Sequence, residues 1–184
     1  MSAWIFLPGE GARSLQQALY SNSDTAIGTP ANIYANQVVD VVRTTVVDNQ
    51  FVLTEWKQPT VLPESVIQFD LYRSSDNANF YYLTSIPSVQ TDFSDYNVDV
   101  QKLSYYYKVL VLNKCDVNEN LSDVSSTILL SGEVSNDYIY SLKWTDYKHW
   151  ANGVDHYVIE KIDATGAWIP VGKVDGATTN YEER

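Results

Sequence analysis

The sequence is poor in several residue types, and each shortage limits what the protein can be. Its 184 residues include one cysteine, Cys115, so no disulfide can form within the chain. No run of 18 apolar residues occurs, which argues against a membrane-spanning helix. Lys and Arg number 12 against 23 Asp and Glu, and the net charge of −11 disfavours nucleic acid and anionic membranes as partners. The first residues lack the basic start and apolar length of a signal peptide, so we expect any export signal to lie outside this sequence.

What the chain does contain is typical of strands. Tyrosine is frequent at 14 residues, and runs of β-branched and aromatic residues alternate with turns rich in Asn, Asp and Ser. Seven such segments follow one another: Val38–Val47, Phe51–Trp56, Val66–Arg73, Phe80–Ile86, Thr91–Phe93, Ser104–Leu112 and Ser125–Leu130. Short strands at this spacing predict an all-β fold, an antiparallel β-sandwich.

The pattern then repeats at a constant offset. Seven residues recur in kind 88 positions later: Trp56 as Trp144, Phe69 as Tyr157, Arg73 as Lys161, Phe80 as Trp168, Leu83 as Val171, Thr91 as Thr179, and Phe93 as Tyr181. A gapless period of this length predicts tandem copies of one structural unit. We therefore expect a lead-in or remnant of a preceding module over 1–35, a complete unit over 36–132, and a C-terminally incomplete unit over 133–184. The second unit should lack the last two strands of the first.

Large residues on the inward strand faces are the expected core. They are Trp56, Phe69, Tyr105, Tyr107, Trp144, Tyr157 and Trp168. We expect one tyrosine to bury its ring and bond its hydroxyl to nearby backbone, as at the corner of such sandwiches. Tyr105 is the first candidate for this role and Tyr107 the alternative.

These residues also carry a family resemblance. A Trp ending the second strand, the strands Phe69–Arg73 and Tyr157–Lys161, and the alternating Tyr105–Val111 strand resemble fibronectin type III domains over roughly 36–184. Leu71–Ser74, Phe93–Asp95, Tyr105–Val109, Asn113–Cys115 and Trp150–Tyr157 further resemble modules of large surface and gliding-motility-associated proteins of gliding bacteria. The resemblance implies spacers, adhesive modules or accessory domains at the cell surface or outside the cell.

More aromatic residues are present than two small cores need. Of this surplus, Tyr72, Tyr106, Tyr147 and Trp150 are the candidate binding residues. Exposed rings on a flat sheet can stack on sugars or anchor a protein partner. The alternative is ordinary cross-strand packing on the sheet surface.

Metal and catalytic signals are weak. Asp116, Asn118 and Asn120 place oxygen ligands at alternate positions, and Asp123 could join them in a loose calcium site. Leu121 stands where an EF-hand needs Gly, so we expect a solvated loop and no cofactor. Two histidines without a second cysteine make zinc binding a poor prospect. Asp92 and Asp95 are a weak candidate for the pair of catalytic carboxylates of a glycosidase.

The sequence therefore predicts a non-catalytic structural or adhesive module of a larger secreted or cell-surface protein. Its expected partners are the neighbouring domains of that protein and a glycan or protein ligand. The alternative is a carbohydrate-binding accessory region of an extracellular enzyme.

Overall fold

The computed structural model describes residues 38–60, 65–114 and 121–183. All of them lie in one compact part of the chain, Asn32–Arg184, which contains both repeat units. No α-helix occurs among these residues, and all strand pairs are antiparallel. The expected all-β class is confirmed. No helix that is long and apolar enough to cross a membrane occurs in the described part of the chain.

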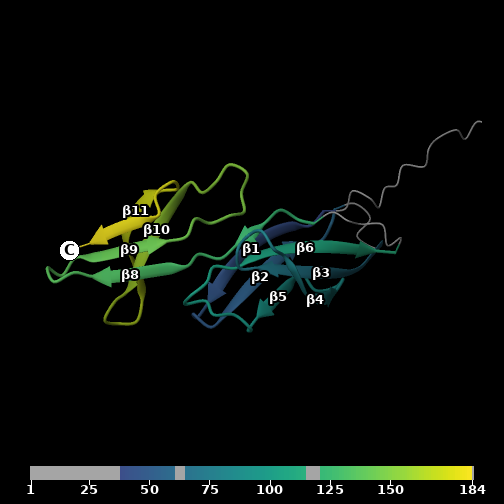
Figure 1. The fold of residues 1–184 in the computed structure, drawn as a ribbon, viewed down its shortest axis with the longest axis horizontal. Helices are drawn as coiled ribbons and strands as arrows, with labels where there is room; N and C mark the ends of the chain where they lie inside the picture. The colour runs from purple at the N-terminus through teal and green to yellow at the C-terminus, as the bar shows by residue number, and fades with distance from the viewer. Residues whose placement is uncertain (1–37, 61–64, 115–120, 184) are drawn as a thin grey trace, which may run out of the picture. The chain divides into compact units, whose positions relative to one another are not determined.

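The first seven strands form two sheets (Figure 1). The three-stranded sheet has the order β1-β2-β5, and the four-stranded sheet has the order β4-β3-β6-β7. Their bounds are β1 Asp40–Val47, β2 Phe51–Lys57, β3 Val66–Ser74, β4 Tyr81–Pro87, β5 Asp92–Asp95, β6 Tyr106–Asn113 and β7 Ser125–Ser126. Side chains alternate between buried and partly exposed along β2 and β6, because each of these sheets covers the core with one face.

The core of this first sandwich is well closed. Its buried apolar side chains come from both sheets, and the rings of Trp56 and Phe69 meet edge to face at 5.4 Å. The Tyr105 hydroxyl accepts a hydrogen bond of 2.9 Å from the Asp99 backbone N–H, so Tyr105 has the corner role expected of it. The buried apolar set is Val39, Val41, Val52, Trp56, Val66, Phe69, Leu71, Ile86, Tyr105, Tyr107, Val109 and Val111.

Five further strands form a second pair of sheets, ordered β12-β9-β8 and β10-β11. They are β8 Leu130–Val134, β9 Tyr140–Trp144, β10 His156–Ile162, β11 Trp168–Asp175 and β12 Asn180–Glu183. The 88-residue offset holds for contacts as well as for residue types. The Trp144 and Tyr157 rings meet at 5.4 Å and 68°, where the Trp56 and Phe69 rings meet at 5.4 Å and 69°.

The last predicted strand of the first unit, Ser125–Leu130, differs from the structure. Only Ser125 and Ser126 pair with β6, while Leu130 begins β8 and pairs with Trp144 of the second unit. Thr127 N–H still bonds to the Tyr105 carbonyl, but Leu129 N–H bonds to the Thr145 hydroxyl. The chain therefore changes sheet between residues 127 and 129, and β8 crosses the boundary that we expected at 132/133.

The second core is open among the described residues. Trp144 and Tyr157 are half-buried rather than buried, and Ile159 alone of the described apolar residues after Leu130 is counted as buried. The prediction that Trp168 lies in the core is wrong, because its side chain is 65% exposed. Trp168 lies in a two-stranded sheet, and a single hairpin offers too little surface to enclose a side chain of this size.

Candidate binding face

The outward face of the four-stranded sheet brings polar and aromatic side chains together. Side chains at alternate positions of a strand share a face, so Gln68, Asp70 and Tyr72 of β3 lie in one row. In the register with β4, Ser85 lies opposite Asp70, and Tyr82 lies opposite Tyr72 across a β-bulge. We call these five residues (Gln68, Asp70, Tyr72, Tyr82 and Ser85) the tyrosine face.

A hydrogen-bond chain fixes the polar half of the tyrosine face. The Ser85 hydroxyl donates to Asp70 Oδ1 at 2.6 Å, so the Tyr82 hydroxyl, 2.8 Å from Ser85, donates in turn to Ser85 Oγ. Gln68 Nε2 donates to the same Asp70 oxygen at 2.8 Å. The second carboxylate oxygen, Asp70 Oδ2, has no hydrogen-bond partner among the described residues and is available to an incoming donor.

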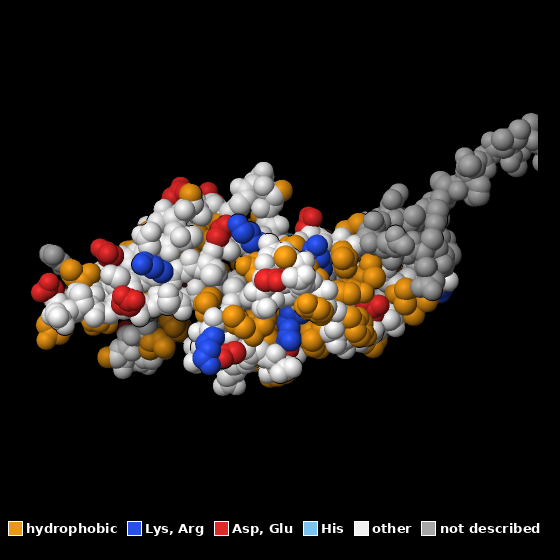
Figure 2. Space-filling model, in the orientation of Figure 1, with side chains coloured by type: hydrophobic (Ala, Val, Ile, Leu, Met, Phe, Trp, Pro, Cys, Tyr) orange, Lys and Arg blue, Asp and Glu red, His pale blue; other side chains and the backbone are white. Residues whose placement is uncertain are grey.

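The aromatic half is held by ring contacts. The Tyr72 and Tyr82 rings meet edge to face, with centroids 5.9 Å apart and planes at 77°. Tyr72 is half-buried, whereas Tyr82 is 57% exposed. Beside them, Lys108 Nζ lies 4.6 Å from the centre of the Phe80 ring. Hydrophobic side chains gather on the surface over the region of β3, β4 and β6 (Figure 2).

The four predicted binding aromatics do not form one platform. Tyr72 belongs to the tyrosine face, and Tyr106 is half-buried opposite Ser126. Tyr147 and Trp150 come from the β9–β10 loop, where their ring centroids are 5.1 Å apart. Trp150 is 54% exposed, but the Tyr147 hydroxyl lies 3.4 Å from the Thr44 backbone nitrogen.

Sequence reasoning did not select the polar members of the tyrosine face. The sequence identified Tyr72 as a candidate binding residue, but it did not identify Gln68, Asp70 or Ser85. A signal existed for two of them, since residues 68, 70 and 72 alternate on one face of a strand whose other face carries Phe69 and Leu71. Ser85 could not be found in this way, because its place opposite Asp70 depends on the β3–β4 register.

Most of the predicted calcium ligands lie outside the described residues, namely Asp116, Asn118 and Asn120. Asp123 is described and exposed, and its carbonyl accepts a hydrogen bond of 2.9 Å from the Ser122 hydroxyl. Within the described ranges, no three His, Cys, Asp or Glu side chains come together in a way that could hold a metal. Calcium binding therefore stays a prediction.

A buried ionic cluster crosses between the two sheets of the first sandwich. Arg73 Nη1 donates to Asp95 Oδ2 at 2.6 Å, and the Tyr107 hydroxyl donates to the same oxygen at 2.9 Å. Burial, with the Asp95 charge adding, raises the pKa of the Tyr107 hydroxyl far above its usual range. Burial is the largest single influence on the Arg73 guanidinium and lowers its pKa, but the hydrogen bond and the charge of Asp95, with Tyr107 and Tyr105 adding, together raise that pKa above its usual value.

This arrangement bears on the Asp92 and Asp95 pair. Asp95 is 3% exposed, and its oxygens also accept a bond of 3.0 Å from the Asn97 N–H. Asp92 is exposed. The Asp95 carboxylate thus accepts hydrogen bonds from Arg73, Tyr107 and Asn97. This geometry suits a residue that joins the two sheets better than one half of a catalytic pair.

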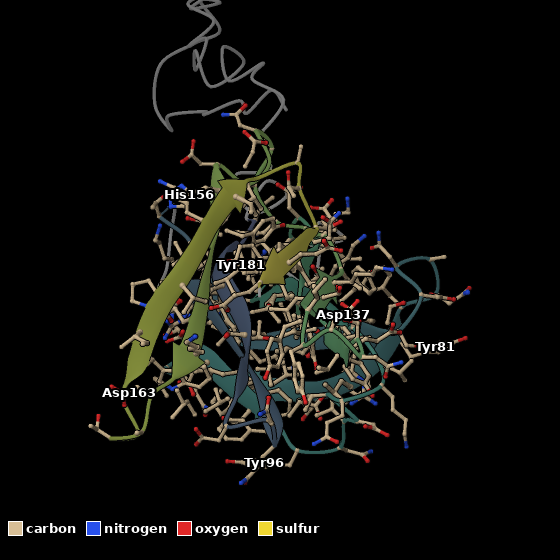
Figure 3. The ribbon with its side chains drawn as sticks, turned by 90° about the vertical axis from the view of Figure 1, so that its left-hand side faces the viewer. Tyr81, Tyr96, Asp137, His156, Asp163 and Tyr181 are labelled. Atoms are coloured by element: carbon tan, nitrogen blue, oxygen red, sulfur yellow. The ribbon has the colours of Figure 1, made fainter. Side chains whose placement is uncertain are left out.

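Two hollows on the described surface are small. One of about 280 Å³ is lined by Val38–Val41, Asp123 and His149. Another of about 200 Å³ lies between Arg73, Tyr81, Tyr82, Leu103 and Tyr105, and Figure 3 shows Tyr81 pointing away from the protein. Both volumes fall below the roughly 300–1,000 Å³ of small-molecule pockets, so a flat face suits this surface better than a deep site.

Comparisons with known proteins give structural matches. No protein-family model matches the chain, and no curated protein matches it. Among solved structures, pectate lyase Pel3 from Pectobacterium carotovorum is 19% identical with a TM-score of 0.38, and a β-1,2-glucanase from Parabacteroides distasonis is 17% identical with a TM-score of 0.39. These matches cover 49% and 50% of this chain but 26% and 12% of the two enzymes.

A segment of two fibronectin type III domains from chicken tenascin is 17% identical, with a TM-score of 0.34, over 78% of this chain and 79% of that one. The fold assignment itself rests on this chain's own strand order. Sheets ordered β1-β2-β5 and β4-β3-β6-β7, with the Tyr105 corner between them, make the first unit a fibronectin type III-like sandwich.

Proposed function

We propose that this chain is a non-catalytic scaffold of tandem fibronectin type III-like units within a larger protein at the cell surface or outside the cell. One observation supports the proposal: the contacts that recur between the two units are contacts that join one sheet to the other. The edge-to-face ring pair recurs at 88 residues. So does the ion pair between the sheets, Arg73 with Asp95 at 2.6 Å and Lys161 with Glu183 at 3.0 Å.

Backbone hydrogen bonds outside the paired strands recur at the same offset of 88 residues. Trp56 N–H bonds to the Thr91 carbonyl, and Trp144 N–H bonds to the Thr179 carbonyl. The β-bulge between Leu71 and Tyr72 returns between Ile159 and Glu160. Repetition of contacts that hold sheets together favours a role in which each unit mainly has to keep its shape. The narrower resemblance to surface proteins of gliding bacteria supports placing the parent protein outside the cell.

Turnover is the direct test. The purified chain is incubated with neutral and acidic polysaccharides and with a peptide library, and new reducing ends and new amino termini are measured. We expect no release above a heat-treated sample. Release that is lost on heating, and that survives further purification, would contradict the proposal.

The alternative, a carbohydrate-binding accessory region, is favoured by one specific observation. The tyrosine face combines an exposed ring with a carboxylate oxygen that has no partner among the described residues. A scaffold and a binding region are compatible roles, since a sheet can hold its shape through one face and bind through the other.

A further inference from the structure

The tyrosine face has the composition of a surface prepared for a polar, ring-shaped ligand. Its outermost ring, Tyr82, is 57% exposed yet restrained at two points. The ring meets the Tyr72 ring edge to face with centroids 5.9 Å apart, and the hydroxyl bonds to Ser85 at 2.8 Å. An exposed ring that is already held loses little conformational freedom on binding, which favours affinity.

Acceptor atoms lie beside this ring. Asp70 Oδ2 and Gln68 Oε1 have no hydrogen-bond partner among the described residues, while Asp70 Oδ1 and Gln68 Nε2 are bonded to each other at 2.8 Å. The bonded atoms fix the two side chains, and the unbonded atoms remain for a ligand. A ligand for this face must therefore offer hydroxyl or N–H donors as well as a surface that packs on an aromatic ring.

Charge narrows the ligand further. The chain carries a net charge of −11, and the tyrosine face itself contains a carboxylate. Lys108, opposite Tyr72 in the register, lies over the Phe80 ring, and no ion pair joins it to Asp70 among the described residues. The negative net charge and the Asp70 carboxylate repel phosphate, sulfate and uronate groups, and they favour a neutral ligand rich in hydroxyls.

We propose that the tyrosine face binds a neutral glycan, with a pyranose C–H face on the Tyr82 ring and its hydroxyls donating to Asp70 and Gln68. The site goes beyond the scaffold role and adds a binding function to it. Its failure would leave the scaffold proposal standing, because that proposal is tested by turnover.

Native affinity electrophoresis of the full chain tests the site. The acidic chain migrates toward the anode, and gels contain hydroxyethyl cellulose, xyloglucan, galactomannan or laminarin as neutral probes, with polygalacturonate as the anionic probe. We expect retardation in at least one neutral gel. Tyr82→Ala should weaken it about tenfold or more, as loss of a central aromatic contact does, and Asp70→Asn should weaken it while keeping the side-chain volume.

Matched variants separate binding from folding. Tyr138→Ala removes a tyrosine that is 78% exposed at the β8–β9 turn, and it should leave retardation unchanged. Tyr82→Phe keeps the ring and should retain most binding, and Asp70→Asn still tests the site if Tyr82→Ala does not fold.

Several results would overturn the proposal. They are no retardation in any neutral gel, equal retardation of wild type and the Asp70→Asn and Tyr82→Ala variants, or retardation by polygalacturonate alone. Self-association of the free chain that Tyr82→Ala abolishes, without glycan retardation, would instead assign the face to a second copy of the chain and would also overturn it.

Discussion

At the scale of single residues, Asp95 joins the two sheets of the first sandwich. Its carboxylate is 3% exposed and accepts from Arg73 at 2.6 Å and from Tyr107 at 2.9 Å. Removing it takes the carboxylate acceptor from the buried Tyr107 hydroxyl and leaves the partly buried Arg73 guanidinium with the Asn97 carbonyl, at 2.9 Å, but without its counter-charge. We expect Asp95→Ala to lower the free energy of unfolding by about 3 kcal/mol, measured in urea.

The repeat supplies the matched control for that variant. Glu183 holds the equivalent place opposite Lys161, but the side chains of this pair are 33% and 54% exposed. Water screens such a pair, so Glu183→Ala should lower the free energy of unfolding by less than about 1 kcal/mol. Equal effects of the two variants would show that burial does not decide how much the ion pair between the sheets stabilises its unit.

The Tyr107 hydroxyl should make stability fall in alkali. Burial and the Asp95 charge raise its pKa in the folded protein above the ordinary value of 10.0. Above pH 10 the unfolded chain has released this proton while the folded chain keeps it, so the stability it provides is present below pH 10 and is lost as pH rises further. Tyr107→Phe cannot titrate, and its stability deficit relative to wild type should therefore shrink above pH 10, as denaturant curves at a series of pH values would reveal. A deficit that stays constant to pH 11.5 would argue against this account.

At the scale of strands, the sequence predicted which segments recur better than it predicted what encloses them. The 88-residue offset extends in the structure to strand pairing, since β9 and β12 pair as β2 and β5 do, with Leu142 opposite Tyr181 where Thr54 lies opposite Phe93. It could not predict that Trp168 would be exposed, because residue type is repeated while the enclosing strands are not. Ser85 of the tyrosine face was missed for a related reason, since it meets Asp70 only through the β3–β4 register.

The β10–β11 hairpin offers a test at this scale. Tyr181 of β12, labelled in Figure 3, donates to the Val171 carbonyl at 2.9 Å, and its ring lies over Gly172 of β11. A Cβ on Gly172 would come within 2.5 Å of that ring. We expect Gly172→Ala to move Tyr181, break its bond and destabilise the second unit by about 1–3 kcal/mol.

Hydrogen exchange of the β9–β12 amides measures that change, because it reports on the second unit separately. Tyr181→Ala removes the obstructing ring, so adding Gly172→Ala to it should cost much less than it does in wild type. Additive effects of the two substitutions would place the cost in the β11 backbone instead of the ring contact.

At the scale of the whole chain, the two units share an arrangement of strands and differ in how completely their cores are enclosed. Trp56 is 3% exposed inside a sandwich of seven strands, whereas its counterpart Trp144 is half-buried among five. The exposed apolar side chains are concentrated accordingly, with Val134, Val158, Ile162 and Trp168 each more than half exposed in the second unit. Since stability follows the apolar area removed from water, the second unit should unfold first.

Two tryptophan variants test this difference. Trp56→Ala leaves a cavity in a closed core and should cost roughly 3–5 kcal/mol, removing the more stable of two transitions in a urea titration followed by circular dichroism. Trp144→Ala gives up a half-buried ring, so it should cost less and should shift only the first transition. Because the two effects fall on different units, the double variant should show their sum. A single transition that both variants shift together would mean that the units fold as one, and equal costs would mean that the second core is as well enclosed as the first.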